Sequence, residues 1–511
     1  MKIVLKILGV LVFLALLAVV RSEWLEHQLR ASVEQTRRDV RQKKFRTDLA
    51  DFDFSLAPEF HTRTALVLSA GLAVRGAQAV HEIQLRERVG TNVALAVSPI
   101  EHLEGRRSTN LWPELRLELA ARAAQLDQAC AALLAGPIKF HITFVDNLRL
   151  PHVADYRTLA RALAVRAVLA MHDQQSNAMF TNLFALSKMV TAWEPEPADI
   201  CHLVRFAVLD SAEQALWESM QTDLWSEPQL AVLQAEWESV QLLAQLPETF
   251  ELNGASMTRL CRRAREERYS QKIDGWGTVL RTAITAPRTG LPNLWASLKG
   301  YRAHAAYRDR GGYEEEKALL LHFAQRHDEA KRAVAASTWH EMREIPGVTN
   351  VVPFRGSPQS LIASMMNLRQ MSVNLQGQGR TLLARAAEAE CKRRIIITAL
   401  ALERFALEHR RYPQHLRELV PAFVPAVPLD FMDGEALRYR REDDGRYLLH
   451  SIGLDGMDDG GQMLVLAELS QRRRPRAGGP RTDIVWPLRA RQADVDWFEE
   501  LQQEIIPEVR E

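Results

Sequence analysis

The chain has 511 residues, of which 47% are apolar and 25% carry a charge. This composition excludes a disordered chain, and its length is enough for about two or three buried cores, so we expect a multidomain globular body. Sixty-five Lys and Arg residues balance 64 Asp and Glu residues, and the resulting net charge of +1 points neither to nucleic acid nor to a strongly charged substrate.

The first segment is basic and then strongly apolar. Lys2 and Lys6 precede the unbroken apolar run Ile7–Val20. With the three apolar residues before Lys6, the run has about 18 residues, or roughly 27 Å of helix, which matches a hydrocarbon core if Lys6 reaches the interface. A cleaved secretory signal is the alternative, but Ala18–Ser22 offers no small-x-small site and amphipathic sequence continues beyond it. We therefore expect an uncleaved transmembrane anchor over residues 1–22.

The charges on either side of this anchor bear on its orientation. Only Lys2, Lys6 and the amino terminus precede the run, whereas Arg21 and a basic cluster at 37–46 follow it. Much of that cluster lies beyond the distance at which charge strongly affects insertion. We expect a single-pass protein of the inner membrane with the bulk of the chain in the periplasm. Such a chain has no cytoplasmic output domain, which argues against a signal transducer.

Helical patterns dominate the next three quarters of the chain. Residues 23–60 mix charged and apolar positions and are broken by Pro58, which predicts a juxtamembrane helix and a linker. Residues 61–385 carry helical spacing between short proline-marked breaks, which predicts a large all-α helical array. The exception is Ile138–Val145, where β-branched and aromatic residues predict a lone strand or an extended connector.

The sequence pattern changes in residues 386–511 from helical spacing to a mixture of helix and strand patterns, so we expect a small α+β domain there. Cys391–His409 has helical periodicity and is followed by Tyr412-Pro413. Leu437–Arg441 and Arg446–Ser451 alternate around Asp443-Asp444-Gly445, which predicts an antiparallel hairpin. A last amphipathic helix is indicated by four apolar positions, Val495, Phe498, Leu501 and Ile505. The fold class is therefore mainly α with one small α+β region.

A glycine and aspartate loop, His450–Gly461, follows the second predicted strand. Crowded carboxylates repel one another unless solvent or a cation screens them, and glycines let backbone carbonyls turn inward, as calcium sites require. Asp455, Asp458 and Asp459, together with Asp483, are therefore candidate calcium ligands. A solvated turn that uses Asp and Gly for their backbone preferences is the alternative. A bound ion would be structural, because it would tie the hairpin to the stretch near Asp483.

The succession of features in the last quarter resembles the globular part of the major pseudopilins of type II secretion systems. The resemblance covers about a fifth of the chain and rests on an ordered series: a helix, Tyr412-Pro413, Leu416-x-x-Leu419, Pro428-x-Asp430, Gly434-x-x-Leu437-x-Tyr439, a hairpin, Ser451-x-Gly453-x-Asp455-Gly456, Gly460-Gly461 and Asp483-Ile484. It implies a long helix on a small antiparallel sheet and a calcium-binding loop in which Asp455 matches a ligand position.

The chain also departs from that family. No prepilin cleavage site is present, and no acidic residue precedes Glu23, whereas pseudopilins carry a glutamate near the start of the mature hydrophobic helix. Gln462 stands where the family tends to place a second acidic ligand, and Phe431 stands where it has proline. Assembly into a pseudopilus is therefore not implied. The composite of anchor, helical region and tail resembles uncharacterised membrane-anchored bacterial envelope proteins.

Motifs for catalysis are weak. His340-Glu341 lacks the second histidine of a zincin helix, and Gly377–Arg380 is too short for a dinucleotide loop. Cys201 and His202 are neighbours on a predicted helix, so their side chains point about 100° apart and do not face each other. A Gly-x-Ser-x-Gly elbow is absent from the sequence. No catalytic residue is therefore assigned.

The four cysteines and one basic run are the remaining features of the sequence that bear on structure and binding. No C-x-x-C pair occurs among the four cysteines, so we expect buried free thiols, with disulfides as the alternative, at Cys130, Cys201, Cys261 and Cys391. Arg472–Arg476 predicts a solvated loop, with binding to an anionic envelope polymer or lipid headgroups as the alternative.

These observations favour a non-enzymatic, membrane-anchored envelope protein with an interaction or structural role and a calcium-stabilised, pseudopilin-like C-terminal domain. Its expected partners are the membrane and envelope or secretion-system proteins, and nucleic acid is not among them. One alternative is an envelope hydrolase whose active site in the helical region uses dispersed groups such as Glu82, His141 and His172. An accessory pseudopilus subunit is the other.

Overall fold

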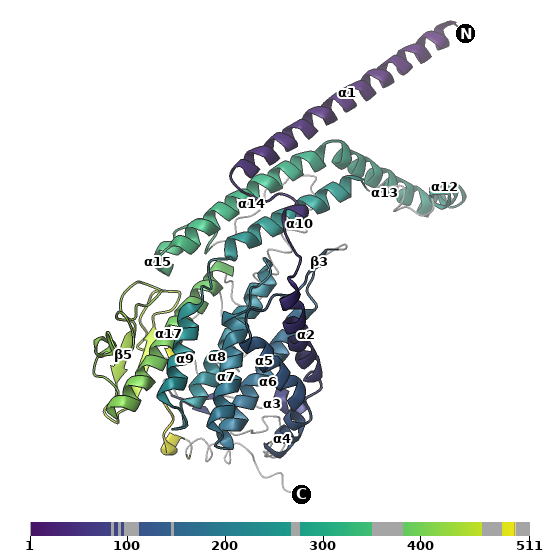
Figure 1. The fold of residues 1–511 in the computed structure, drawn as a ribbon. Helices are drawn as coiled ribbons and strands as arrows, with labels where there is room; N and C mark the ends of the chain where they lie inside the picture. Colours follow the sequence, from purple (N-terminus) through teal and green to yellow (C-terminus); the bar gives the residue numbers. More distant parts are fainter. Residues whose placement is uncertain are drawn as a thin grey trace. The chain divides into compact units, whose positions relative to one another are not determined.

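The computed structural model describes residues 2–82, 86–89, 93–96, 112–144, 148–266, 276–349, 382–461, 483–494 and 496 (Figure 1). Helices dominate these residues, as the sequence predicts. The chain forms two compact units. Unit 1 comprises the described residues of Met1–Asp53 and Pro247–Lys331, and unit 2 those of Phe54–Leu246, Arg332–Thr349 and Gln378–Glu511. This division does not coincide with the boundaries expected at residues 22, 60 and 385.

Unit 1 is built from long helices that come from two distant parts of the chain. Its elements are α1 (Lys2–Gln42), η1 (Leu49–Asp51), α10 (Leu246–Glu266), α12 (Trp276–Thr285), α13 (Pro287–Ala306), the π-helical turn η2 (Tyr307–Gly311) and α14 (Gly312–Ala335). Val40 and Phe45 meet Cys261 of α10 and Leu319 and Phe323 of α14 in one apolar cluster. Unit 1 therefore has its own core, which sequence order alone does not reveal.

Helices α12 and α13 form a hairpin that extends away from α10 and α14 (Figure 1). Gly290 of α13 lies against the backbone of α12, where an added Cβ would stand 2.2 Å from the Thr282 oxygen. Only glycine allows this close approach. The two helices therefore pack tightly on each other.

The N-terminal segment is helical from Lys2 onward. Among the described residues, no helix combines the length and the apolar character that crossing a membrane requires. Most side chains of the expected anchor, residues 1–22, lie outside the described set.

Unit 2 is a body of packed helices. They are α2 (Pro58–Ala73), α3 (Gln78–Glu82), α4 (Trp112–Ala120), α5 (Ala123–Leu134), α6 (His152–His172), α7 (Ser176–Thr191), α8 (Asp199–Ser219), α9 (Glu227–Ser239), α15 (Trp339–Met342) and α17 (Leu382–His409). Prolines open some of them: Pro58 begins α2, and Pro228 stands in the first turn of α9, where Ser226 and Gln229 form a capping box. Large side chains such as Trp217, Trp237 and Phe206 fill the core.

Short strands accompany the helices of unit 2. A small hairpin pairs β1 (Arg86–Val89) with β2 (Val93–Ala96), and another pairs β3 (Thr143–Phe144) with β4 (Leu148–Arg149). Ile138 forms a parallel bridge with Trp193, so Ile138–Val145 begins as an extended connector and enters β3. The expected connector is thus confirmed for the described part of this segment.

The C-terminal region of unit 2 has the expected hairpin. Strands β5 (Arg438–Arg441) and β6 (Tyr447–Ser451) are antiparallel, and β7 (Ile484–Trp486) adds a third strand beside β6. The preceding helix ends at His409 as predicted, but it starts at Leu382 instead of Cys391. The 3₁₀ helix η3 (Leu416–Leu419) lies between this helix and the sheet.

This region shares the core of the helical body. The indole nitrogen of Trp217 in α8 donates to the Pro487 carbonyl at 2.8 Å, and the Gln234 amide of α9 donates to the Phe423 carbonyl at 2.7 Å. Arg404 of α17 pairs with Glu227 of α9. The described residues of 386–461 and 483–494 therefore contact helices α8 and α9 of unit 2.

Three predictions lie outside the described residues. They concern Gly377–Arg380, the basic run Arg472–Arg476, and the final helix with Val495, Phe498, Leu501 and Ile505.

Candidate functional sites

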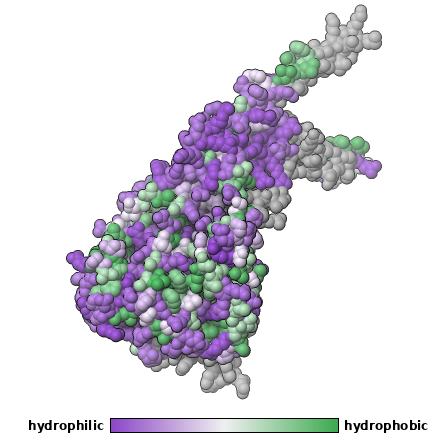
Figure 2. Space-filling model, viewed as in Figure 1, coloured by the Kyte–Doolittle hydropathy of each residue, from purple (hydrophilic) through white to green (hydrophobic). Residues whose placement is uncertain are grey.

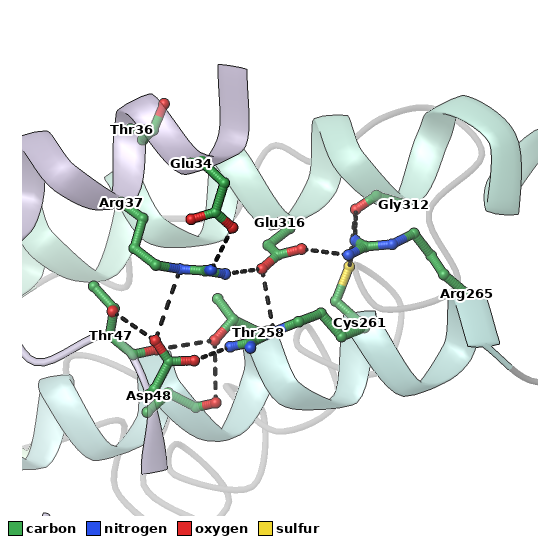
Figure 3. A network of polar contacts seen from close by, with 12 residues as sticks. Glu34, Thr36, Arg37, Thr47, Asp48, Thr258, Cys261, Arg265, Gly312 and Glu316 are labelled. Atoms are coloured by element: carbon green, nitrogen blue, oxygen red, sulfur yellow. Dashed lines mark hydrogen bonds and ion pairs between the residues drawn. The ribbon is translucent and has the colours of Figure 1, made fainter. Parts of the chain in front are cut away.

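A network of buried charges holds unit 1 together (Figure 3). Its centre is the Glu316 carboxylate of α14, whose side chain is 1% exposed. One oxygen accepts from Arg37 of α1, and the other accepts from Arg265 of α10 at 2.7 Å. Arg262 of α10 lies 3.3 Å from the first oxygen. A single carboxylate therefore joins three helices, and both of its oxygens are bonded.

Asp48 extends this network to the segment after α1. It forms ion pairs with Arg41 at 2.9 Å and with Arg37 at 3.8 Å, and it accepts from Arg262. Burial acts to raise the pKa of Asp48, but the Arg262 guanidinium and the other partners hold that pKa below its usual value. The network thus fixes the end of α1 to α10 through charges that satisfy one another.

The same region contains a tightly fitted turn at the start of α14. The Cys261 thiol and the Arg265 guanidinium both donate to the Gly312 carbonyl, at 3.0 Å and 2.9 Å. A Cβ at Gly312 would stand 2.6 Å from the Arg265 side chain. Burial raises the pKa of the Cys261 thiol to about 12, so this thiol stays protonated and unreactive. These contacts are structural.

The second cluster lies at the glycine and aspartate loop in unit 2. The Nε2 atom of His450 in β6 is 3.0 Å from the Asp458 carboxylate and 3.7 Å from the Asp483 carboxylate. One ligand atom from each of the three residues lies within 4.8 Å of the other two. The side chains of His450 and Asp483 are buried, whereas that of Asp458 is 47% exposed. This arrangement places a ring nitrogen between two carboxylates at the edge of the unit.

Backbone groups of the loop hold the Asp483 carboxylate. It accepts from the amide of Gly461 at 2.7 Å and from the amide of Asp459 at 3.1 Å. Gly461 has φ 76° and touches Leu448 and His450, so it needs both the left-handed conformation and the missing side chain. Burial raises the pKa of Asp483, and the hydrogen bond with His450 lowers that of Asp458.

Two of the four predicted metal ligands come together here. Asp458 and Asp483 meet around His450, while Asp455 accepts from the amide of Met457 in its own turn at 3.2 Å. Asp459 contributes its backbone amide to Asp483. The sequence interpretation did not include His450 among the candidate metal ligands. Leu448 and His450 are two residues apart in β6, so their side chains lie on the same face of the sheet.

Asp430, which belongs to the series of residues that resembles the pseudopilins, has a structural role in this fold. The fully buried Asp430 carboxylate accepts from the Ser451 hydroxyl at 2.8 Å, from the Met432 amide at 2.9 Å and from Arg438 at 3.0 Å. It also accepts from the amide of Ile452. Asp430 therefore joins the start of the glycine and aspartate loop, at Ser451 and Ile452, to Arg438 of β5.

The residues weighed for catalysis are dispersed. His172 stacks on Trp112, His141 lies near the Phe54 carbonyl, and Glu82 ends α3. None of the converging groups of His, Cys, Asp and Glu in the described part of the chain contains them. The expectation of buried free thiols is confirmed for all four cysteines.

His340 and Glu341 stand on the short helix α15, and that helix is docked. Its Trp339 amide donates to the Phe431 carbonyl at 2.7 Å, and its indole donates to the Leu454 carbonyl at 2.8 Å. The segment therefore serves to hold the loop region.

One cluster was not anticipated from the sequence at all. His152, Glu196 and Cys201 come from three places in the helical body, and their ligand atoms also lie within 4.8 Å of one another. Cys201 had been considered only with its neighbour His202, which is fully buried. Burial lowers the pKa of His202 to about 3.

Comparisons with known proteins assign no family to these clusters. No protein-family model, no curated protein and no solved structure matches the chain. What each cluster can do must therefore be argued from its own geometry.

Proposed function

We propose that the protein is a non-enzymatic, single-pass envelope protein of the inner membrane, with an interaction or structural role and with the bulk of the chain in the periplasm. Helix α1 provides the anchor, its second half is bound into unit 1, and unit 2 presents the surface for envelope or secretion-system partners. The C-terminal region keeps its proposed likeness to pseudopilins. The observation that carries the proposal is a continuous α1 on which the described apolar side chains from Phe13 to Trp24 are exposed, while its second half is bound into unit 1.

The exposed half of α1 supports an apolar environment. Large apolar side chains, with Phe13 60% exposed and Val20 65% exposed, recur on it at Phe13, Leu16, Leu17, Val20 and Trp24. Figure 2 shows a green segment on this helix, while the neighbouring surface of unit 1 is largely hydrophilic. Such a stripe is costly in water, and a bilayer would cover it. Trp24 follows the run, as expected for a residue at the interface.

The α12–α13 hairpin provides a second apolar surface in unit 1. Ile284 is 78% exposed and Trp295 is 73% exposed, and Leu280, Leu291 and Leu298 are exposed as well. Amphipathic helices of this kind lie in the plane of the membrane interface, with their apolar face in the acyl boundary. We place this hairpin on the same membrane that holds α1.

The second half of α1 is bound along its length. Tyr313 of α14 donates to Glu26 at 2.9 Å, Lys317 donates to Ser32 at 2.9 Å, and Arg37 reaches Glu316. These three contacts hold α1 against α14 along the second half of α1. The connection between α1 and α14 within unit 1 is therefore stiff, which suits a structural protein.

The loop cluster supports a cation as a structural element. Two carboxylates would share it, and calcium is the ion that the pseudopilin likeness implies. The imidazole of His450 changes the preference, since nitrogen ligands favour zinc or manganese over calcium.

Membrane attachment is tested by alkaline extraction of cell membranes. Full-length protein should resist extraction, whereas the double variant F13E/L17E should be released because charges in the bilayer core are strongly unfavourable. The matched control places the same charges on exposed leucines elsewhere, in L72E/L321E, and should remain in the membrane. Release of the unchanged protein into the alkaline supernatant would refute the anchor.

The cation is tested by thermal unfolding of the full chain in chelator, calcium or zinc. We expect a higher melting temperature with a divalent ion, and loss of that increase in Asp483→Asn. If calcium and zinc at millimolar concentration leave the melting temperature unchanged, the loop is held by its own histidine. A response to zinc alone that disappears in Asp483→Asn and persists in Glu196→Gln would identify the ion class of this loop.

A further inference from the structure

The most deeply buried ligand cluster lies inside the helical body of unit 2. His152 is the first residue of α6, Glu196 lies in the connection between α7 and α8, and Cys201 stands in the first turn of α8. His152 and Glu196 are each 2% exposed, and Cys201 is 0% exposed. One nitrogen, one oxygen and one sulfur thus converge within 4.8 Å of one another.

The connection that carries Glu196 is rigid. Proline stands on both sides of it, at Pro195 and Pro197, which restricts the backbone. One Glu196 oxygen accepts from the Phe140 amide at 2.8 Å. The start of the connection is held where Ile138 bridges Trp193. The other Glu196 oxygen is therefore held in a fixed place.

Aromatic side chains fix the histidine as well. The His152 ring stacks on Phe140 with centroids 4.3 Å apart and 8° between the planes, and Trp193 meets it edge-on at 6.4 Å. Tyr156 lies edge-on to Phe140 and closes this apolar wall. The imidazole is thus oriented by packing.

Several polar atoms of the cluster lack a hydrogen bond. Both ring nitrogens of His152 and the second oxygen of Glu196 are buried and make none with the residues that the structure describes. The His152 Nε2 atom and this oxygen are 3.3 Å apart, but they are not aligned for a hydrogen bond. Unpaired buried polar groups cost about 1–3 kcal/mol each, so their convergence calls for a partner.

We propose that Cys201, His152 and Glu196 bind a transition-metal ion, with zinc the best match to a sulfur, a nitrogen and an oxygen donor. Thiolate, imidazole and carboxylate are the three ligand types that zinc accepts, and calcium and magnesium do not take thiolate. The ion would tie the start of α6 to the start of α8 and to the connection before it. This site is separate from the loop cluster and does not depend on the proposed envelope function.

The cluster is not a nucleophilic centre. The thiol has no exposed surface and is kept protonated in the absence of metal, whereas reactive cysteines are partly exposed and have a lowered pKa. A closed metal site of this kind is structural, and it forms as the chain folds.

Cobalt substitution of the full-length protein tests the proposal. Protein stripped of metal and loaded with Co²⁺ should show sulfur-to-cobalt charge-transfer absorption in the near ultraviolet, because Cys201 supplies a thiolate. Cys201→Ser should lose this band. Cys130→Ser, which alters another buried thiol of the same unit, should keep it. The loop cluster contains no sulfur, so His450→Ala should keep the band as well.

A milder variant covers the case in which Cys201→Ser does not fold. Glu196→Gln retains the shape and one oxygen donor, so it should fold, bind Co²⁺ at least tenfold more weakly and keep the charge-transfer band at saturating metal. Absence of the band in the unchanged protein, or equal affinity in Glu196→Gln, would overturn the proposal.

Discussion

Glu316 in unit 1 and Glu196 in unit 2 are both almost wholly buried carboxylates, with 1% and 2% of their surface exposed, yet their surroundings differ. Arginines from two helices bond both oxygens of Glu316. Glu196 has one oxygen on a backbone amide and the other beside a histidine that makes no hydrogen bond with the described residues. Burial of a charge therefore does not by itself mark a binding site. Unsatisfied polar atoms that converge do.

The chemistry of the partners follows the same division. Guanidinium groups are always charged and form two bonds in a fixed geometry, so they complete a carboxylate without any outside ion. The neighbours of Glu196 are a thiol and an imidazole, and a metal ion binds such groups as thiolate and as neutral imidazole. The Glu316 network in unit 1 satisfies its own charges, whereas the ligand atoms around Glu196 in unit 2 suit a bound metal ion.

The largest expected effect comes from breaking the closed network. Glu316→Gln should destabilise unit 1 by about 3–5 kcal/mol, because Arg37 and Arg265, whose side chains are 11% and 12% exposed, then lose their shared carboxylate. Hydrogen exchange of the α14 amides measures this. Glu314→Gln on the same helix, which removes an exposed pair with Arg310, should cost at most about 1 kcal/mol. Similar protection of α14 in both variants would contradict a central role for Glu316.

Metal removal should have the next largest effect, and it should act on the other region alone. With zinc in about hundredfold excess over its dissociation constant, unfolding of the zinc-loaded protein should require about 2.7 kcal/mol more than that of the metal-free protein. Denaturant titration with and without chelator checks this. Glu196→Gln should shrink the difference, whereas Glu316→Gln should keep it. A difference that disappears in both variants would show that the two regions are not independent.

The stability of unit 1 should also depend on pH through His322 of α14. Burial, together with the nearby Arg326, lowers the pKa of His322 to about 4. The unfolded chain therefore binds the proton first, and unfolding takes up about one proton between pH 6.5 and pH 4. Stability should fall as the pH drops through this window, by at most about 1.4 kcal/mol per pH unit for this group.

The matched variants for this dependence are His322→Gln and His27→Gln, the latter at an exposed position on α1. We expect the denaturant midpoint of unit 1 to depend less strongly on pH in His322→Gln than in the unchanged protein. His27→Gln should leave this pH dependence unchanged. An unchanged slope in that variant would assign the acid sensitivity to other groups.

The smallest effect is expected at Asp455. Its carboxylate bonds only to the Met457 amide in the described structure, within its own turn, so Asp455→Asn should change stability by less than about 0.5 kcal/mol. Asp483→Asn should cost more, because this buried carboxylate holds the amides of Gly461 and Asp459. Thermal unfolding of the two variants side by side tests the ranking, and a larger loss in Asp455→Asn would reverse our interpretation of the loop.

Local parts of the fold were predictable from the sequence. The end of α17 at His409 follows from Tyr412-Pro413, and the β5–β6 hairpin follows from alternating residues around a turn with Gly445. The loop after β6 was recognised from its glycines and aspartates. These features depend on residues that are neighbours in the chain, and such patterns can be read directly.

The long-range arrangement was not predictable in the same way. Unit 1 combines the start of the chain with helices that begin near Pro247, and no local pattern records that meeting. The Cys201 cluster was missed for the same reason, since His152 precedes it by two helices. The sequence does offer one signal, since Glu196 is a carboxylate between two prolines in a short connection between helices.

Anomalous X-ray scattering at the zinc absorption edge is the most direct test of the contrast between the two regions. Crystals of the full chain, purified without chelator, should show a peak among Cys201, His152 and Glu196, with a zinc–sulfur distance of about 2.3 Å. No peak should lie beside Glu316. Zinc elsewhere in the crystal with none at Cys201, or a peak beside Glu316, would contradict it.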